Sequence, residues 1–251
     1  MDLGLADRVY VVTGGARGLG RATADVLVAE GARVVLSGRT EETLAAAVTE
    51  LGDDAAYVVG DNAEPGLPGR LIDAARTTWG RLDGALISVG GPPAGSVART
   101  TDEQWTTAFG SVFLGAVRMA REVAAALGEG GSIAFVLSTS VKAPLTEMAI
   151  SNGLRPGLAM IAKQLADELG PRGIRVNGLL PGRVGTERVA ELDALQDDPI
   201  AAAASAAQRI PLRRDGEPSE FGRAAAFLLS PAASFVSGAM LPVDGGVMRA
   251  L

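Results

Sequence analysis

The chain contains 251 residues, of which 47% are hydrophobic and 21% charged, and this balance is typical of a folded globular domain. It has no histidine and no cysteine, which excludes a Ser-His-Asp triad, a cysteine nucleophile, disulfides and ordinary zinc or iron–sulfur sites, so no metal site is expected. The net charge of −6 disfavours nucleic acid as a partner. The N-terminal segment lacks a basic leader, and no apolar run approaches the roughly 18 residues of a spanning helix, so we expect a cytoplasmic protein without a membrane partner.

Short apolar runs alternate with longer amphipathic segments along the chain. The runs predict buried strands at residues 8–12, 32–37, 55–59, 82–88, 131–138 and 173–180. The segments between them predict helices near 18–30, 41–51, 67–79, 102–127 and 156–169. Parallel strands need crossover connections that cover the sheet. The pattern therefore predicts an α/β fold: one domain over residues 1–251, with a doubly wound, Rossmann-like parallel sheet and helices on both faces.

Residues 186–212 depart from this alternation. They are rich in alanine and lie between the last predicted strands. We interpret them as a helical flap over a substrate site, although a solvated pair of helices has the same pattern.

A glycine-rich turn follows the first predicted strand and runs directly into a helix. Gly14, Gly18 and Gly20 have the spacing G-x-x-x-G-x-G. Glycines let the main chain approach a pyrophosphate, and a helix N-terminus supplies unpaired N–H groups and positive potential. The turn therefore predicts a dinucleotide-binding site.

Two arginines indicate which dinucleotide binds. In NAD-binding sheets an acid commonly follows the second strand and bonds the ribose 2′-hydroxyl, but this chain has Arg39 at that point. Arg17, inside the glycine-rich turn, adds a second cation near the same place. Guanidinium groups suit a 2′-phosphate, so we expect NADP(H) as the cofactor.

Several motifs occur in an order that resembles the short-chain dehydrogenase/reductase family over essentially the whole chain. They are TGGARGLG at 13–20, GSIAFVLS at 131–138, RVNGLLPGRVGT at 175–186 and SGAMLPVDGG at 237–246. The resemblance implies that Asp61 contacts adenine and that Thr186 contacts the nicotinamide carboxamide. The other cofactor-binding residues that it implies are Leu19, Asn62, Gly90, Arg155, Pro181 and Gly182. It also implies a homotetramer or homodimer that packs through the C-terminal segment and the helices near 102–127 and 152–169.

The catalytic positions depart from the family pattern. Ser138 matches the family's catalytic serine, but Ser151 stands at the tyrosine position and Arg155 at the lysine position. The thirteen-residue spacing from Ser138 to Ser151 matches the family, which argues against misalignment. Val112 replaces the usual asparagine. Pro156 follows directly, and because proline is costly inside a helix, we expect the helix to begin later than in the family.

The remaining groups can still support carbonyl reduction. Ser138 can donate a hydrogen bond to the carbonyl oxygen, and Arg155 can hold ribose hydroxyls. The proton would come from water, from the substrate, or from Ser151 as a relay, because serine is a weak acid and arginine keeps its proton. Lys142, four residues after Ser138, is either a further cation at the site or a solvated loop lysine.

These residues favour an NADPH-dependent ketoreductase acting on a small molecule. The high alanine, glycine and arginine content resembles that of proteins from GC-rich actinobacteria, and this suggests a bulky, aromatic polyketide substrate. A 3-oxoacyl thioester is the simpler option. Loss of the family's tyrosine and lysine keeps two other hypotheses open: an NADP-binding sensor or regulatory protein without turnover, and a lyase or isomerase that uses NADP structurally.

Overall fold

The computed structural model describes residues 2–249 and confirms the predicted fold class. Within these residues seven parallel strands form one sheet in the order β3-β2-β1-β4-β5-β6-β7. The strands are β1 Val9–Thr13, β2 Arg33–Gly38, β3 Ala55–Val59, β4 Gly84–Ile87, β5 Ser132–Val136, β6 Arg175–Pro181 and β7 Met240–Val243. The chain moves outward from β1 through β2 and β3, then returns to place β4 on the other side of β1. This reversal opens a crevice at the carboxyl ends of β1 and β4, where open α/β sheets bind ligands.

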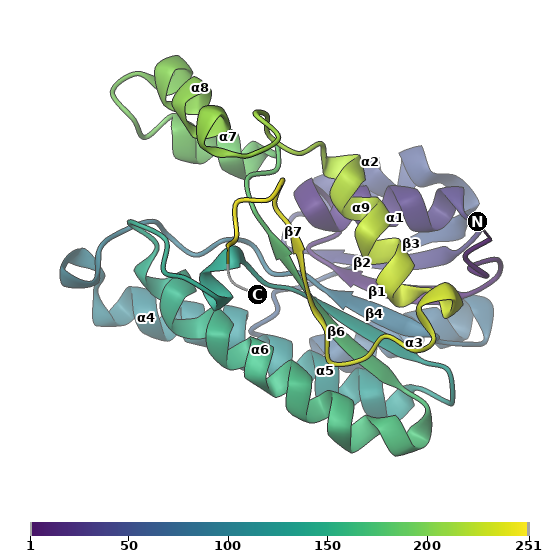
Figure 1. Ribbon diagram of the computed structural model, residues 1–251. Helices are drawn as coiled ribbons and strands as arrows, with labels where there is room; N and C mark the ends of the chain where they lie inside the picture. The colour runs from purple at the N-terminus through teal and green to yellow at the C-terminus, as the bar shows by residue number, and fades with distance from the viewer. Residues whose placement is uncertain (1, 250–251) are drawn as a thin grey trace.

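Helices cover both faces of the sheet (Figure 1). One hydrophobic core holds side chains from α3, α5 and α6, and the other holds side chains from α1, α2 and α9. The helices on the sheet are α1 Gly18–Ala29, α2 Glu41–Leu51, α3 Leu67–Trp79, α5 Gly115–Ala126, α6 Ala149–Leu169 and α9 Pro218–Leu229. The central strands are buried on both faces, which explains their nearly continuous apolar sequences.

The six predicted strands are confirmed, with ends that differ by a few residues. The helix predicted over 102–127 is confirmed as an unbroken helical run, but its middle is not α-helical: α4 (Asp102–Ala108) and α5 are joined by a π-helix at Phe109–Leu114. Sequence periodicity does not distinguish a π-helix turn from an α-helix turn. Helix α9 was not among the predicted helices, although Pro218 at its first position and the bond from the Glu217 N–H to the Glu220 carboxylate are ordinary start signals.

The prediction that Pro156 delays the helix is wrong. Helix α6 begins at Ala149 and contains Pro156 in its interior. An interior proline costs roughly 3 kcal/mol because it removes one backbone hydrogen bond and crowds the preceding turn. The helix nevertheless buries one face in the core, including Ile150, Leu158 and Ala162, and burial of such side chains contributes more than that cost. The Asn152 side chain also bonds the N–H (3.0 Å) and the C=O (2.8 Å) of Leu145, which fixes the start of the helix.

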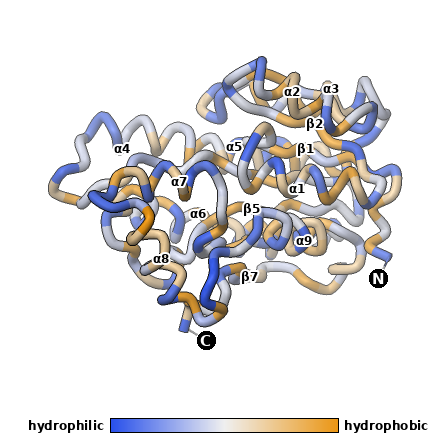
Figure 2. Tube along the Cα trace, turned by 90° about the horizontal axis from the view of Figure 1, so that it is seen from above, coloured by the Kyte–Doolittle hydropathy of each residue, from blue (hydrophilic) through white to orange (hydrophobic). Residues whose placement is uncertain are grey.

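The segment after β6 forms two short helices that lie away from the sheet (Figure 1). They are α7 Glu187–Asp193 and α8 Pro199–Arg209, and neither contains a buried residue. Figure 1 shows the pair above the level of α4 and α6, and Figure 2, seen from above, shows it on the same side of the molecule as those helices and away from α2 and α3. We call residues 186–212 the flap; whether it covers a substrate stays a prediction.

The flap is joined to the rest of the domain by two chain segments that lie side by side, residues 183–185 and 215–216, which we call the neck. Val184 and Gly216 pair as an isolated β-bridge, and the Gly185 N–H donates to the Gly216 carbonyl at 2.9 Å. Arg183 holds both ends, because its guanidinium bonds Asp193 in α7 and Asp215 beyond α8. These ion pairs raise the pKa of Arg183 and lower that of Asp193. The neck therefore fixes where the flap begins and ends.

Within residues 2–249 no helix combines the length and the hydropathy needed to cross a membrane.

Candidate cofactor and catalytic site

The glycine-rich turn lies at the carboxyl end of β1, as the sequence predicts. Gly14 and Gly18 have φ values of +60° and +57°, a conformation that favours glycine. A Cβ at Gly20 would lie 2.2 Å from the Gly14 carbonyl oxygen, so only glycine fits there. No side chain caps the start of α1, which leaves its first N–H groups, including that of Leu19, available to an anion.

Hydrogen bonds fix this turn to the rest of the crevice. The Thr13 hydroxyl donates to the Ser88 carbonyl at 2.7 Å and accepts from the Ser88 N–H at 2.8 Å, which ties the end of β1 to the end of β4. The Gly15 N–H donates to the Ser37 carbonyl at 3.0 Å. The turn is therefore held on both sides by neighbouring strands.

The residues expected at the adenine end lie after β2 and β3. Arg39 is exposed and makes no hydrogen bond or ion pair to any residue between 2 and 249. Asp61 accepts a bond from the Ala63 N–H at 2.8 Å, and this bond shapes the loop that follows β3. The Asn62 carbonyl oxygen would lie 2.2 Å from a Cβ at Gly115, so that glycine lets the loop pack directly on α5.

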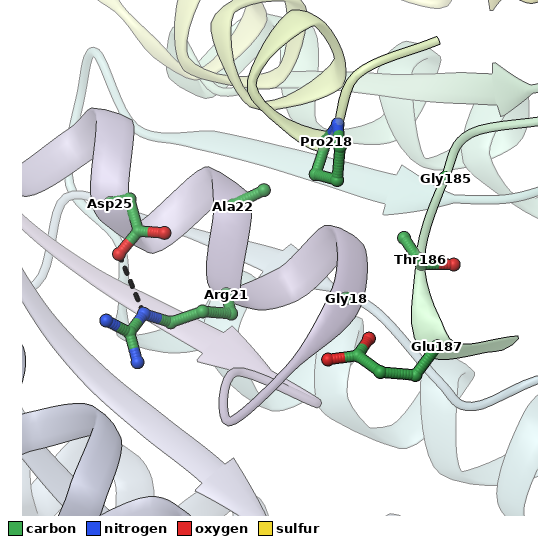
Figure 3. A pocket seen from close by; sticks show the side chains of 8 residues that line it. All are labelled: Gly18, Arg21, Ala22, Asp25, Gly185, Thr186, Glu187 and Pro218. Atoms are coloured by element: carbon green, nitrogen blue, oxygen red, sulfur yellow. Dashed lines mark hydrogen bonds and ion pairs between the residues drawn. The ribbon is translucent and has the colours of Figure 1, made fainter. Parts of the chain in front are cut away.

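Arg17 points toward the flap. Its guanidinium lies 3.7 Å from the Glu191 carboxylate on α7, in an exposed ion pair. Glu187, also on α7, has its carboxylate oxygen 3.8 Å from the position of a Cβ at Gly18 (Figure 3). The flap and the glycine-rich turn therefore face each other across the crevice.

The nicotinamide end is built by the residues that follow β6. Pro181 is the last residue of the strand, and the Gly182 N–H donates to the Val243 carbonyl at 3.0 Å. A Cβ at Gly182 would lie 2.6 Å from the Asp244 Cβ, so this turn also requires glycine. Thr186 precedes α7 but does not cap it, which leaves its hydroxyl available for a ligand.

Part of the space between the glycine-rich turn and the segment after β6 is a defined pocket. A pocket of about 420 Å³ lies beside the first turn of α1 and is lined by Gly18, Arg21, Ala22, Asp25, Gly185, Thr186, Glu187 and Pro218 (Figure 3). No atom lies within 4 Å of a Cβ built at Gly90, so that position is open. The Nε of Arg188, a residue that the sequence analysis did not select, is buried without a hydrogen-bond partner in the described residues. Open glycines and an unused donor are features that suit an anionic ligand.

The catalytic positions lie at the carboxyl end of β5 and on α6. Ser138 follows β5 and is partly exposed, and its Oγ accepts from the Ser140 N–H at 3.1 Å. Ser151 is only 3% exposed, and its Oγ lies 3.2 Å from the Ser140 Oγ. Ser138 and Ser151 are therefore both in contact with Ser140, which the sequence analysis did not select.

Arg155 is buried at the end of the sheet without an acidic partner. Its guanidinium donates to the Val136 carbonyl at 2.6 Å and to the Val89 carbonyl at 3.4 Å, and so it bridges the ends of β5 and β4. Burial lowers the pKa of Arg155 to about 10, so the group keeps its charge at neutral pH. Val112, at the asparagine position, is buried in the π-helix and contributes to the core.

Comparisons with known proteins agree with this geometry. A family model described as enoyl-(acyl carrier protein) reductase matches residues 14–248. Oxidoreductase asL5 of Sarocladium schorii is 32% identical over 98% of this chain and 97% of its own length, and cis-4-hydroxycyclohexanecarboxylate dehydrogenase of Sinomonas cyclohexanicum is 32% identical over 98% of each chain. The crystal structure of L-sorbose reductase from Gluconobacter frateurii with NADPH and L-sorbose superimposes with a TM-score of 0.91, at 29% identity and full coverage of both chains.

Proposed function

The chain belongs to the short-chain dehydrogenase/reductase family, and from that premise we propose that it is an NADPH-dependent ketoreductase of ring-bearing carbonyl compounds. It is an oxidoreductase of alcohol or carbonyl groups that uses a nicotinamide cofactor. The observation that carries the proposal is the position of Ser138, which lies at the end of β5 with its hydroxyl partly exposed beside the crevice.

The choice of NADP(H) over NAD(H) depends on Arg39. The two residues directly after β2 are Arg39 and Thr40, neither of them acidic, and Arg39 is exposed and unpaired among the described residues. A 2′-phosphate would gain a charge-assisted hydrogen bond from this guanidinium. The L-sorbose reductase structure contains NADPH, and its fold matches this chain throughout.

Each of the site residues has a separate role in the proposed reaction. The bound cofactor supplies a hydride. The first N–H groups of α1 hold the pyrophosphate, and Thr186 holds the carboxamide. The Arg155 guanidinium fixes the ends of β4 and β5 and directs positive potential toward the ribose hydroxyls. Ser138 donates a hydrogen bond to the carbonyl oxygen and stabilises the negative charge that develops there.

A ring-bearing substrate is favoured by the relatives and by the flap. The relative from Sinomonas cyclohexanicum is named for a hydroxycyclohexanecarboxylate substrate. The L-sorbose reductase structure contains the sugar L-sorbose. The flap buries no side chain of α7 or α8 against the domain, so it can accommodate a bulky compound. Aromatic polyketide ketones belong to this class, and they are the substrates that we propose.

The direct test is NADPH oxidation across a panel of polycyclic aromatic ketones, cyclohexanones and 3-oxoacyl thioesters, with each product identified by mass. We expect the ring ketones to be reduced fastest, and NADH to replace NADPH poorly. If NADPH binds tightly but no compound in the panel is reduced, a sensor without turnover becomes the better description.

We also propose that the protein forms a homotetramer or a homodimer. Phe109 and Leu114, at the two ends of the π-helix, are 46% and 43% exposed, and Met160 on α6 is 68% exposed. Apolar side chains on long helices are typical of interfaces between copies of one chain. Light scattering is expected to give at least twice the monomer mass, and a monomer at micromolar concentration would contradict this proposal.

A further inference from the structure

Carbonyl reduction needs a proton, and the usual donors are absent from this site. The chain has no histidine, and both of its tyrosines lie in strands. Tyr10 is buried and its hydroxyl donates to the Leu229 carbonyl, while Tyr57 bonds Glu41 beyond β2. Neither phenol lies at the carboxyl end of β5.

The residues at the family's catalytic positions cannot supply the proton either. Ser151 is buried and its hydroxyl is paired with that of Ser140. Arg155 is held by two backbone carbonyls, and a guanidinium is a very weak acid. Glu147 in the same loop is paired with Arg99 and is an acceptor when ionised. The face of α6 therefore holds the fold and does not protonate a substrate.

The loop between β5 and α6 is fixed at several points. Ser140 is held by Ser151, and the Leu145 main chain by the Asn152 side chain. The Glu147 carbonyl also accepts from the Gly95 N–H at 2.8 Å. Residues 141–144 lie between the first two anchors, so their main chain is held near the end of β5.

Lys142 lies in this anchored segment, one turn after Ser138. The Val141 N–H donates to the Ser138 carbonyl at 3.1 Å, and the Lys142 N–H donates to the Thr139 carbonyl at 3.0 Å. The Lys142 side chain is exposed and has no ion pair or hydrogen bond with any residue between 2 and 249. A lysine ammonium on a flexible four-carbon chain can reach a group bound at Ser138, and unlike a guanidinium it can release a proton.

We propose that Lys142 is the catalytic proton donor, in place of the water or substrate proton considered from the sequence; this rests on the proposed ketoreductase function. Hydride adds to the carbonyl carbon as the dihydronicotinamide is oxidised, and the C=O π electrons move to oxygen. An N–H bond of the Lys142 ammonium then breaks as the O–H bond of the alcohol forms. The neutral amine regains a proton from solvent, to which the side chain is exposed.

The chain offers a matched control, because Lys163 is its only other lysine. Lys163 lies on α6 and donates to the Gly238 carbonyl at 2.9 Å. Lys142→Ala is expected to lower kcat by about 10²-fold or more, the usual contribution of general acid catalysis, whereas Lys163→Ala retains most activity. NADPH affinity, measured by fluorescence, is expected to be unchanged in both variants.

Three further measurements separate proton donation from a role of charge alone. Lys142→Arg keeps the charge but is expected to be as slow as Lys142→Ala. Added methylammonium is expected to restore Lys142→Ala, and tetramethylammonium, which has no proton, is not. In competitive acetylation read by mass spectrometry, NADP⁺ with a bound ketone is expected to protect Lys142 but not Lys163.

If the wild-type protein reduces ketones, and Lys142→Ala or Lys142→Arg reduces them at the wild-type rate, then Lys142 is not the proton donor but the ketoreductase function still holds. If wild type reduces no ketone, the ketoreductase function and this inference fall together.

Discussion

The loop after β1 and the loop after β5 lie at the same edge of one sheet, but they are built by different means. The loop after β1 depends on glycines, whose lack of a side chain brings main-chain N–H groups to the crevice and leaves room beside them. The second depends on side chains that turn inward, since Ser151 and Arg155 bond other parts of the protein. The first loop thus presents main-chain groups to the crevice, while in the second loop Ser151 and Arg155, two of the predicted catalytic residues, hold the loop and the sheet together.

This comparison predicts that the first loop is most sensitive to added atoms. Gly20→Ala places a Cβ 2.2 Å from the Gly14 carbonyl oxygen, so the backbone must shift. We expect a loss of at least about 3 kcal/mol in the free energy of unfolding and the loss of NADPH binding. Thermal unfolding and a fluorescence titration measure both effects.

Gly69→Ala in α3 is the matched control for that experiment. No atom lies within 4 Å of a Cβ at Gly69, so we expect its stability and NADPH affinity to match or exceed those of wild type. If Gly20→Ala binds NADPH with wild-type affinity, the backbone of the turn can shift to accept a Cβ, and the prediction is contradicted.

The second loop is expected to be most sensitive to removed atoms. Ser138→Ala deletes the donor to the developing oxyanion and is expected to lower kcat by roughly 10²–10³-fold, with little change in NADPH affinity. Ser151→Ala removes only the contact with Ser140 and is expected to cost about 1 kcal/mol of stability while leaving kcat nearly unchanged. Steady-state kinetics of the two variants measure the contrast. An equal loss of kcat in both would place Ser151 in a proton relay.

A smaller effect is expected from charge at the adenine end. Arg39→Asp is expected to weaken NADPH binding by roughly 1–3 kcal/mol, because a charge-assisted hydrogen bond to the 2′-phosphate is lost. NADH has no such phosphate, so its affinity is expected to remain the same or to rise. Titration of both cofactors against wild type and variant gives the comparison, and equal weakening of the two would remove Arg39 from the 2′-phosphate site.

The sequence predicts the parts of this molecule that depend on local patterns. Continuous apolar runs identify the strands because both faces of a parallel sheet are buried, and the glycine spacing identifies the turn after β1. The sequence misplaces the start of α6 because the local rule about Pro156 is outweighed by the burial of one face of the helix in the core. Such contacts join residues that are distant in the sequence, and local propensity does not include them.

The orientation of the site residues could not be predicted for the same reason. The sequence places Ser151 thirteen residues after Ser138, but the partner of its hydroxyl depends on how the loop between them folds. Arg183 joins Asp193 to Asp215 across the neck of the flap, and no local pattern indicates that pairing. Ion pairs between distant segments arise only from the folded chain.

The neck of the flap also has a consequence for how proteins of this kind change over generations. Helices α7 and α8 bury no side chain, and surface substitutions of that kind usually change stability by less than about 0.5 kcal/mol. Arg183 and the Gly185–Gly216 contact hold the two ends of the segment in place whatever lies between them. The flap can therefore accumulate mutations, or be exchanged as a unit, at little cost to folding. The sheet and the glycine-rich turn can be inherited unaltered while the segment between the neck residues changes.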